Sequence, residues 1–436
     1  MKVGMISLGC NKNRVDSETA LGLLQERGWS ITGDFDEAEV LMVNTCGFID
    51  PAKEESIDAI LELAQHKQTG KCRVLVVTGC LAQRYARALM DEIPEIDLLM
   101  GVNQYARLAD AIEARLQGGP RQALCDDDLT FFEHGRVLTT PSYTAYTRIG
   151  DGCSNRCTFC AIPLIRGNYR SRREDLILDE VADLAKRGVR EHILVAQDTT
   201  RYGTDWQEHS ALPELMDKVS RIEGVDWLRV LYCYPDETDE RLLDLIAQRD
   251  NICKYLDLPI QHINDTILHR MHRRGNAQDI RRCLRLARER GLTLRTSIIV
   301  GFPGETEEQF QELLDFLKEA EFDRLGAFAY SAEEDTPAAR MPDQIPEEVK
   351  QERLDRLMTL QASISLKRNQ QRVDTLEKVL VTDVGENGAM LGRSQHEAPE
   401  ADGEILFTAA HKPKIGEFVQ VRITRADTYD LIGEMI

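Results

Sequence analysis

One pattern occurs three times in residues 1–135 and restricts how that region can fold. A short run of Val, Ile, Leu and Met ends in a cysteine, and a stretch with helical periodicity follows. The three runs cover residues 3–10, 40–46 and 74–80, and they end at Cys10, Cys46 and Cys80. Short, almost continuously apolar runs are typical of strands buried on both faces of a parallel sheet. Their alternation with helices predicts an open parallel α/β sheet domain over residues 1–135.

The three cysteines share one position in this pattern. Taken singly, each is more typical of a small buried apolar residue than of a ligand. The carboxyl ends of parallel strands, however, lie along one edge of a sheet, and ligands bind at that edge. Because all three strands end in the same way, we expect Cys10, Cys46 and Cys80 to lie together in space.

A second series of strands and helices covers residues 136–370. The strand-like runs lie at residues 144–150, 192–198, 227–233, 255–259, 294–301 and 324–330. Six strand–helix units predict a partial (β/α)6 TIM-like barrel, with its site at the carboxyl ends of the strands. A long amphipathic stretch at residues 346–373 closes the region as one or two helices. Residues 371–436 change to short runs between Gly, Asn and Asp turns, which predicts a small antiparallel β-barrel.

The stretch DGCSNRCTFCAIP follows the first barrel strand and places Cys153, Cys157 and Cys160 within eight residues. Soft thiolates select zinc, Cu(I) or iron–sulfur clusters. Structural zinc sites usually have four protein ligands, often from two paired knuckles, and no second knuckle accompanies this one. Three thiolates on a four-iron cluster leave one iron free to bind something else. The remaining cysteines are interpreted as structural: Cys72, Cys125, Cys233, Cys253 and Cys283.

The stretch SIIVGFPGETEEQF combines a strand, a glycine turn and the start of a helix. Thr306 and Gln309 have the spacing of a capping box. Gly301 and Gly304 would allow the backbone to approach a ligand closely. The stretch is therefore a candidate binding turn at the barrel mouth.

Together these features resemble the radical S-adenosylmethionine (SAM) methylthiotransferases over essentially the whole chain. The resemblance rests on CxxxCxxC, SLGCNKNRVDSE, NTCGFI, TGCLAQRY, LPIQH and GFPGE. It implies one 4Fe–4S cluster with SAM at Cys153, Cys157 and Cys160, a second 4Fe–4S cluster at Cys10, Cys46 and Cys80, and a C-terminal TRAM domain. It also implies SAM contacts at Phe159, Gly301, Pro303 and Glu305, although Phe159 fits a core position equally well. No side-chain base is required, and we assign no catalytic residue.

The family has two branches with different substrates. The MiaB-like branch modifies an adenosine of transfer RNA, and the RimO-like branch modifies an aspartate β-carbon of ribosomal protein S twelve. The stretches GCNKNRVDSE and GRSQHEAPEADGEI resemble the RimO-like branch. In the implied chemistry, one SAM methylates a sulfur at the second cluster, and another supplies the radical that removes hydrogen from the aspartate. The resemblance also implies an electron donor such as flavodoxin or ferredoxin.

Charge favours the same branch. The formal net charge is −20, and residues 372–436 hold seven Lys and Arg against twelve Asp and Glu. Gripping phosphates requires a basic surface, so RNA contact is not favoured, whereas a basic ribosomal small-subunit protein suits an acidic partner. No apolar run approaches the roughly 18 residues of a membrane span, and the N-terminus is typical of a strand. We therefore expect a cytoplasmic enzyme that does not bind membranes.

Three other functions stay open from the sequence. The chain could be a transfer-RNA methylthiotransferase, a non-catalytic RNA-binding protein with structural zinc, or a radical enzyme that uses the N-terminal cluster only as an electron relay. The arginines after the cysteine loop could hold the cofactor carboxylate or the substrate, or could form an exposed basic loop. They are Arg166, Arg170, Arg172 and Arg173.

Overall fold

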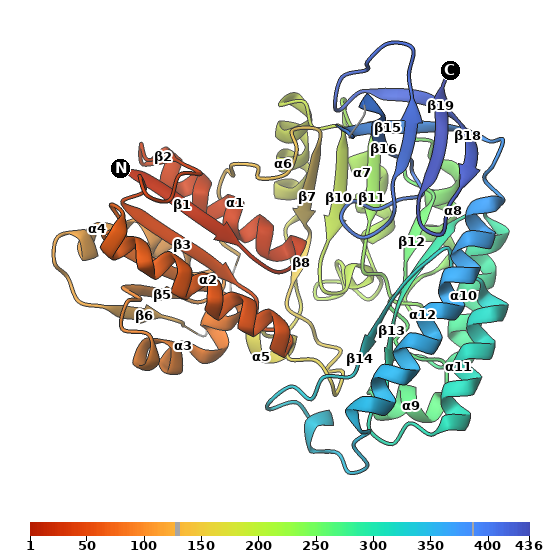
Figure 1. Cartoon of the computed structure of the whole chain (residues 1–436), viewed down its shortest axis with the longest axis horizontal. Helices are drawn as coiled ribbons and strands as arrows, with labels where there is room; N and C mark the ends of the chain where they lie inside the picture. The colour runs from red at the N-terminus through yellow and green to blue at the C-terminus, as the bar shows by residue number, and fades with distance from the viewer. Residues whose placement is uncertain (127–130, 386–387) are drawn as a thin grey trace.

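The computed structural model describes residues 1–126, 131–385 and 388–436, and it has three domains in chain order (Figure 1). The first contains a sheet of six strands that pair in parallel throughout, in the order β2-β1-β3-β4-β5-β6. Its elements are β1 (Lys2–Ser7), α1 (Asn11–Glu26), β2 (Ser30–Ile31), β3 (Val40–Thr45), α2 (Asp50–Thr69), β4 (Val74–Gly79), α3 (Cys80–Glu92), β5 (Leu98–Met100), η1 (Tyr105–Arg107), α4 (Leu108–Leu116) and β6 (Gln122–Leu124).

The parallel sheet confirms the prediction from the apolar runs. Every residue of β3 and β4 is buried, because α1 and α4 cover one face of the sheet and α2 and α3 cover the other. Strands β2, β5 and β6 were not predicted, because they have only two or three residues each. A strand of two or three residues is too short to show an alternating pattern in the sequence. It is recognised only in the structure, where it pairs with a longer neighbour.

The central domain is a partial barrel of six parallel strands in two sheets, β11-β10-β7 and β12-β13-β14. A bridge between Leu228 of β11 and Ile252 before β12, and a 2.9 Å hydrogen bond from the Cys233 amide to the Asp257 carbonyl, link the two sheets. The elements are β7 (Thr144–Arg148), β8 (Gly150–Asp151), α5 (Ile162–Arg166), β9 (Arg170–Ser171), α6 (Glu174–Lys186), β10 (Glu191–Val195), η2 (Thr199–Arg201), α7 (Leu212–Ser220), β11 (Trp227–Val230), α8 (Glu240–Gln248), β12 (Tyr255–Asp257), α9 (Asp265–Arg270), α10 (Ala277–Glu289), β13 (Thr293–Val300), α11 (Glu307–Ala320), β14 (Arg324–Ala329), η3 (Ala338–Arg340) and α12 (Glu347–Gln370).

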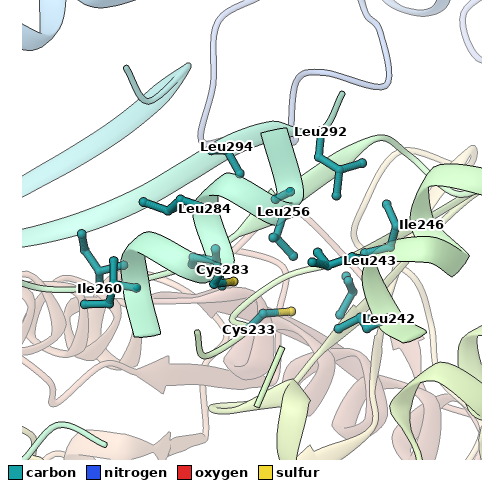
Figure 2. Packing of buried hydrophobic residues seen from close by; sticks show 14 of the residues in the cluster. Cys233, Leu242, Leu243, Ile246, Leu256, Ile260, Cys283, Leu284, Leu292 and Leu294 are labelled. Atoms are coloured by element: carbon teal, nitrogen blue, oxygen red, sulfur yellow. The ribbon is translucent and has the colours of Figure 1, made fainter. Parts of the chain in front are cut away.

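All six predicted barrel strands are present, and the amphipathic stretch at its end is the single helix α12. The capping box at the start of α11 is confirmed, since Thr306 accepts from the Gln309 amide and Gln309 from the Thr306 amide. Cys233 and Cys283 lie among leucine and isoleucine side chains between the barrel and its helices (Figure 2). Their surroundings fit the structural role that the sequence predicted.

The C-terminal domain is a closed barrel in the order β15-β16-β17-β19-β18. The strands are β15 (Leu376–Val384), β16 (Met390–Arg393), β17 (Ile405–Thr408), β18 (Phe418–Ala426) and β19 (Leu431–Met435). The expectation of a fully antiparallel barrel needs one correction, because β17 and β19 pair in parallel. Strand directions cannot alternate all the way around a ring of five, so one neighbouring pair has to be parallel.

Buried charges hold this small barrel against the amino ends of the central strands. Glu191 at the start of β10 pairs with Arg393 of β16 at 2.7 Å, and Arg229 of β11 lies 3.3 Å from the same carboxylate. The β16–β17 loop enters the central barrel, where Ala398 packs in one apolar cluster with Tyr146 and, from α1, Val15. All three domains therefore share one core. Within the described ranges, no helix is long and apolar enough to cross a membrane.

Candidate metal and cofactor site

The structure brings the three N-terminal cysteines to one edge of the first sheet. Cys46 directly follows β3 and Cys80 directly follows β4, and the pairing of Thr45 with Gly79 places these two strand ends side by side. The turn before Cys10 lies against Cys46, because a Cβ added to Gly9 would stand 3.3 Å from the Cys46 sulfur. The expected meeting of the three cysteines is thus a feature of the fold.

Asn13 on the first turn of α1 ties these strand ends together. Its Nδ2 donates to the carbonyl of Leu8 at 3.2 Å and to that of Thr45 at 2.9 Å. Its Oδ1 accepts from the Cys80 thiol at 3.3 Å and from Arg166 Nη2 at 2.7 Å. One amide side chain therefore fixes the backbone beside Cys10 and Cys46 and the sulfur of Cys80.

The three thiols differ in their readiness to ionise. Burial, together with the neighbouring Cys10 and Cys46 thiols, raises the pKa of Cys80 to about 12 despite the Arg166 cation. Burial likewise raises the pKa of Cys46. Desolvation would also raise the pKa of Cys10, but the Lys12 and Arg166 cations and backbone hydrogen bonds bring it below its usual value. A bound cation would complete this group, because neighbouring thiolates repel one another unless positive charge compensates them.

The second group of cysteines lies on the loop that follows β8 at the barrel mouth. Gly152 and Arg156 have positive φ, which curls the loop, and the Cys160 amide donates to the Cys157 carbonyl at 3.0 Å. Burial, the Asp198 carboxylate and the neighbouring Cys157 raise the pKa of Cys153 to about 11. Burial, Cys157 and Cys153 raise that of Cys160 as well. The three thiols of this loop are therefore near enough to influence one another's ionisation.

Arg273 lies beside this second group. Its Nη1 is 3.6 Å from the Cys157 sulfur, and its guanidinium carbon lies 4.2 Å from the centre of the Tyr234 ring. The cysteine spacing gave no indication of this contact. The only signal in the sequence was the basic run HRMHRR, which is more often typical of a solvated helix face.

The donor chemistry of both groups suits an iron–sulfur cluster, because each group offers three thiol side chains. Among residues 1–126, 131–385 and 388–436, no three His, Cys, Asp or Glu side chains are close enough to hold one ion. In an iron–sulfur cluster each thiolate binds its own iron, so the ligands stand farther apart than around one zinc. Each group offers three soft thiolates and a nearby arginine, a donor set suited to an anionic cluster with one open iron.

Helix α5 joins the two groups. It begins two residues after Cys160, and Ala161 and Ile165 pack with Cys80 in one buried cluster. At its end, Arg166 bonds Asp16 of the first domain at 2.8 Å and Asp151 of the barrel at 3.2 Å. The cysteine edge of the sheet therefore lies next to α5 and β8, at the end of the first barrel strand (Figure 1).

A second contact closes the far side of this junction. Glu333, on the loop after β14, is buried and pairs with Lys53 of α2 at 2.6 Å and with Arg84 of α3 at 3.5 Å. Glu333 thus gives the two domains a second contact in addition to the one at Arg166.

The four residues expected to contact SAM lie around the turn after β13. Gly301 has φ of +70°, Pro303 is buried, and Phe159 packs against the apolar cluster that contains Phe302. Glu305 accepts from the Gly301 amide at 2.9 Å and from Arg353 at 2.9 Å, so its carboxylate shapes the turn. Burial raises the pKa of Glu305 to about 7 in spite of that arginine. Contact of these residues with the cofactor stays a prediction.

The arginines after the cysteine loop do not form an exposed basic surface. Arg166 is 1% exposed, and Arg172 is buried between Glu133 and Glu180. Arg173 is exposed and pairs with Asp175. The network around Arg166 was not predicted, because its partners Asn13, Asp16 and Asp151 are distant in the sequence and carry no distinctive spacing.

Three family models match successive parts of the chain. They are the Radical SAM superfamily over residues 147–317, the Uncharacterized protein family UPF0004 over residues 2–101 and the TRAM domain over residues 375–436. The order of these matches agrees with the three domains seen in the structure.

Relatives match over the full length. A protein of Desulforamulus reducens named ribosomal protein uS12 methylthiotransferase RimO is 50% identical over 99% of both chains. A protein of Heliobacterium modesticaldum with the same name is 49% identical over 100% of this chain and 95% of its own. A third, from Pelobacter propionicus, is 48% identical over 100% and 98%.

Solved structures with a similar fold are more distant. The radical S-adenosylmethionine methyltransferase TsrM from Kitasatospora setae has a TM-score of 0.57 at 14% identity, covering 86% of this chain and 78% of that one. The cobalamin-dependent S-adenosylmethionine radical enzyme OxsB has a TM-score of 0.52 at 12% identity, covering 83% and 57%. These likenesses concern the fold alone.

Proposed function

The chain belongs to the RimO family of radical SAM methylthiotransferases, and we propose that it transfers a methylthio group to the β-carbon of an aspartate in ribosomal protein uS12. Identity near 50% over the whole chain supports the family's substrate as well as its chemistry. The acidic C-terminal barrel is consistent with a basic protein partner.

Membership of the radical SAM superfamily implies a 4Fe–4S cluster and SAM. We propose that Cys153, Cys157 and Cys160 hold this cluster and leave one iron for SAM. When bound there, the cluster would supply the electron for reductive cleavage of SAM, the radical chemistry that gives the superfamily its name. The chain's own part is to bind and to shield: Arg273 places a positive charge beside Cys157, and the loop buries Cys153 and Cys157.

A second 4Fe–4S cluster at Cys10, Cys46 and Cys80 completes the proposal. The observation that carries it is the junction at α5, where Cys80 packs against Ala161, the residue after Cys160. A sulfur held at the first group would therefore lie near a radical formed at the second. Arg166 and Glu333 both hold the first domain against the barrel, which would keep the two groups close to each other during the reaction.

Other partners follow from the proposed chemistry. The reaction needs single electrons, which we expect from a donor such as flavodoxin or ferredoxin. Because the proposed substrate is a ribosomal protein, we expect the enzyme to act in the cytoplasm. A transfer-RNA substrate is the competing proposal, because the TRAM domain is a reason to test RNA contact.

The test compares the two substrates directly. The enzyme is reconstituted anaerobically with iron and sulfide, and is then incubated with SAM and a reductant together with uS12 or with unmodified transfer RNA. We expect mass spectrometry to show SCH₃ replacing hydrogen on one aspartate of uS12 and no change in the RNA. Methylthio-adenosine without modified uS12 would favour the transfer-RNA proposal, and product without sulfur would favour a relay role for the N-terminal cluster.

A further inference from the structure

Lys12 is a buried cation that the reaction described above does not use. It lies two residues after Cys10, in the first turn of α1, and only 7% of its surface is exposed. Its Nζ stands 3.3 Å from the centre of the Tyr232 ring. Tyr232 follows β11 at the carboxyl ends of the barrel strands, so the ammonium reaches from the first domain across to the barrel mouth.

This ammonium lacks the partner that such groups usually have. Within the described ranges, no carboxylate lies in ion-pair distance of Lys12 Nζ, and Nζ donates no hydrogen bond to a protein atom. The neighbouring interface cations are paired: Arg148 and Arg166 both bond Asp16. An ammonium has three donors, and a single ring face offsets only part of the cost of burying it. The position therefore calls for an anion supplied from outside the chain.

The surroundings of Lys12 have further features of a binding site. Tyr232 has φ of +65°, a left-handed conformation that is strained for a bulky side chain and is found preferentially at functional sites. Asn11 donates to the Tyr232 hydroxyl at 3.3 Å, while the buried Oδ1 of Asn11 has no partner among the described residues. Asn11 and Tyr232 are therefore fixed beside the ammonium, and the Asn11 Oδ1 is still free to accept a hydrogen bond from a ligand.

We propose that Lys12 binds the side-chain carboxylate of the substrate aspartate. This inference rests on the proposed function, because it names the contact by which that substrate would be oriented. The carboxylate carbon of aspartate is bonded directly to the β-carbon, so fixing the carboxylate places the reacting carbon within one bond of the anchor. Lys12 lies close to Cys10, and α1 carries it over the barrel mouth, so the reacting carbon would lie between the two thiolate groups.

Two other roles of Lys12 would give different experimental results when the residue is replaced. If Lys12 only balanced negative charge at Cys10, replacing it would disturb the N-terminal cluster. The preference of the enzyme for aspartate over asparagine in the substrate would not change. If Lys12 held the carboxylate of SAM, its removal would weaken SAM binding. Neither role couples Lys12 to the charge of the substrate side chain.

The test is a double-mutant cycle between enzyme and substrate. Binding of uS12 to the reconstituted enzyme with SAM is measured by titration calorimetry for wild type and Lys12→Met, each with native uS12 and with the target aspartate changed to asparagine. Each single change should weaken binding about 30-fold, the size expected for losing one member of a desolvated charge pair. The second change should add little to the first, so Lys12→Met should bind both substrates about equally. Lys12→Arg should recover part of the discrimination.

Arg14→Met is the matched control. Arg14 lies on the same turn of α1, but its guanidinium pairs with Glu400 of the C-terminal barrel. It should keep the full preference for aspartate over asparagine. Iron content and SAM affinity should be unchanged in Lys12→Met, and a loss in either would overturn the proposal in favour of one of the other roles.

Additive effects in the cycle, with Lys12→Met still preferring aspartate, would overturn the inference while leaving uS12 as the substrate. Wild-type enzyme that fails to bind or modify uS12 would overturn both this inference and the proposed function.

Discussion

The Arg166 guanidinium lies 3.7 Å from the Cys80 sulfur, although 86 residues separate them in the chain. The same side chain bonds Asp16 of the first domain and Asp151 of the barrel. Because Arg166 ends the helix that begins two residues after Cys160, this contact connects Cys80 to the segment that follows the second cysteine group.

Replacing Arg166 with Met should destabilise the protein strongly. The change leaves Asp16 and Asp151 buried without their shared cation, and breaking a buried pair in this way costs about 3–5 kcal/mol. In urea unfolding, the N-terminal domain of the variant should unfold at a lower urea concentration than that of the wild type. Arg173→Met, which removes only an exposed pair with Asp175, should shift the midpoint little. Equal midpoints for the two variants would contradict the role assigned to Arg166.

Iron content should separate the two cysteine groups. Changing Cys10, Cys46 and Cys80 together to Ala should reduce the iron from about eight to about four atoms per chain, because one of two four-iron clusters is lost. Cys72→Ala is the control, since Cys72 lies in the apolar core between the sheet and α2. Anaerobic iron and sulfide analysis with electron paramagnetic resonance gives the readout. Full iron content in the triple variant would show that the N-terminal cysteines hold no cluster.

Gly152→Ala should prevent assembly of the barrel cluster. Gly152 has φ of +72°, and an added Cβ would lie 2.2 Å from the Asn168 carbonyl oxygen. The obstacle is backbone, so the loop that carries Cys153 has to move. Gly188→Ala is matched in backbone conformation, with φ of +97° and no atom within 4 Å of an added Cβ, and should cost only the strain of about 1–2 kcal/mol.

The measurement for this pair is iron content and the rate of SAM cleavage. Gly152→Ala should lose SAM cleavage and about half of its iron, while Gly188→Ala keeps both. Normal SAM cleavage by Gly152→Ala would mean that the loop carrying Cys153 can change its backbone conformation and still bind the cluster.

Low pH should weaken the attachment of the C-terminal barrel to the central domain, because Glu191 becomes protonated. Burial opposes ionisation of this carboxylate, but Arg393 and Arg229 hold its pKa at about 2, below the usual 4.5. The pairing therefore stabilises the fold fully above pH 4.5. As the pH falls from 4.5 to about 2, the unfolded chain takes up a proton that the folded chain resists, and the contribution of a few kcal/mol is lost.

Glu191→Gln should remove this dependence, giving a less stable protein at pH 7 and a shallower loss of stability below pH 4.5. Fluorescence of Trp227 can report the transition, because its ring lies 4.7 Å from that of Phe418 in the C-terminal barrel. An unchanged acid profile in Glu191→Gln would assign the acid sensitivity to other groups, such as His192, whose pKa burial lowers to about 4.

Much of the fold could be predicted because each long helix or strand has a recognisable pattern in its own stretch of sequence. The buried strands β3 and β4 are continuous apolar runs, and Thr306 marks the start of α11 through its capping box. The short strands β2, β5 and β6 were missed because two or three residues have no period. The parallel β17–β19 pair was missed because strand direction around a closed ring depends on the number of strands and not on any one stretch.

The candidate site divides in the same way. The six cysteines were identified from spacing and from their common place after strands, both of which are local properties. Asn13, Arg273 and Lys12 were not identified, because an amide or a cation acquires a role only from what lies opposite it in space.

The sequence by itself determined the three domains' architectures and the two sets of candidate thiol ligands, since periodicity and cysteine spacing act over a few neighbouring residues. Only the tertiary structure decided that Cys80 packs beside the segment after Cys160, which cations lie next to the two sets and which ammonium is left without an anion. Those relationships depend on packing between segments more than 80 residues apart, as between Cys80 and Arg166, and on the high cost of burying charge that has no partner.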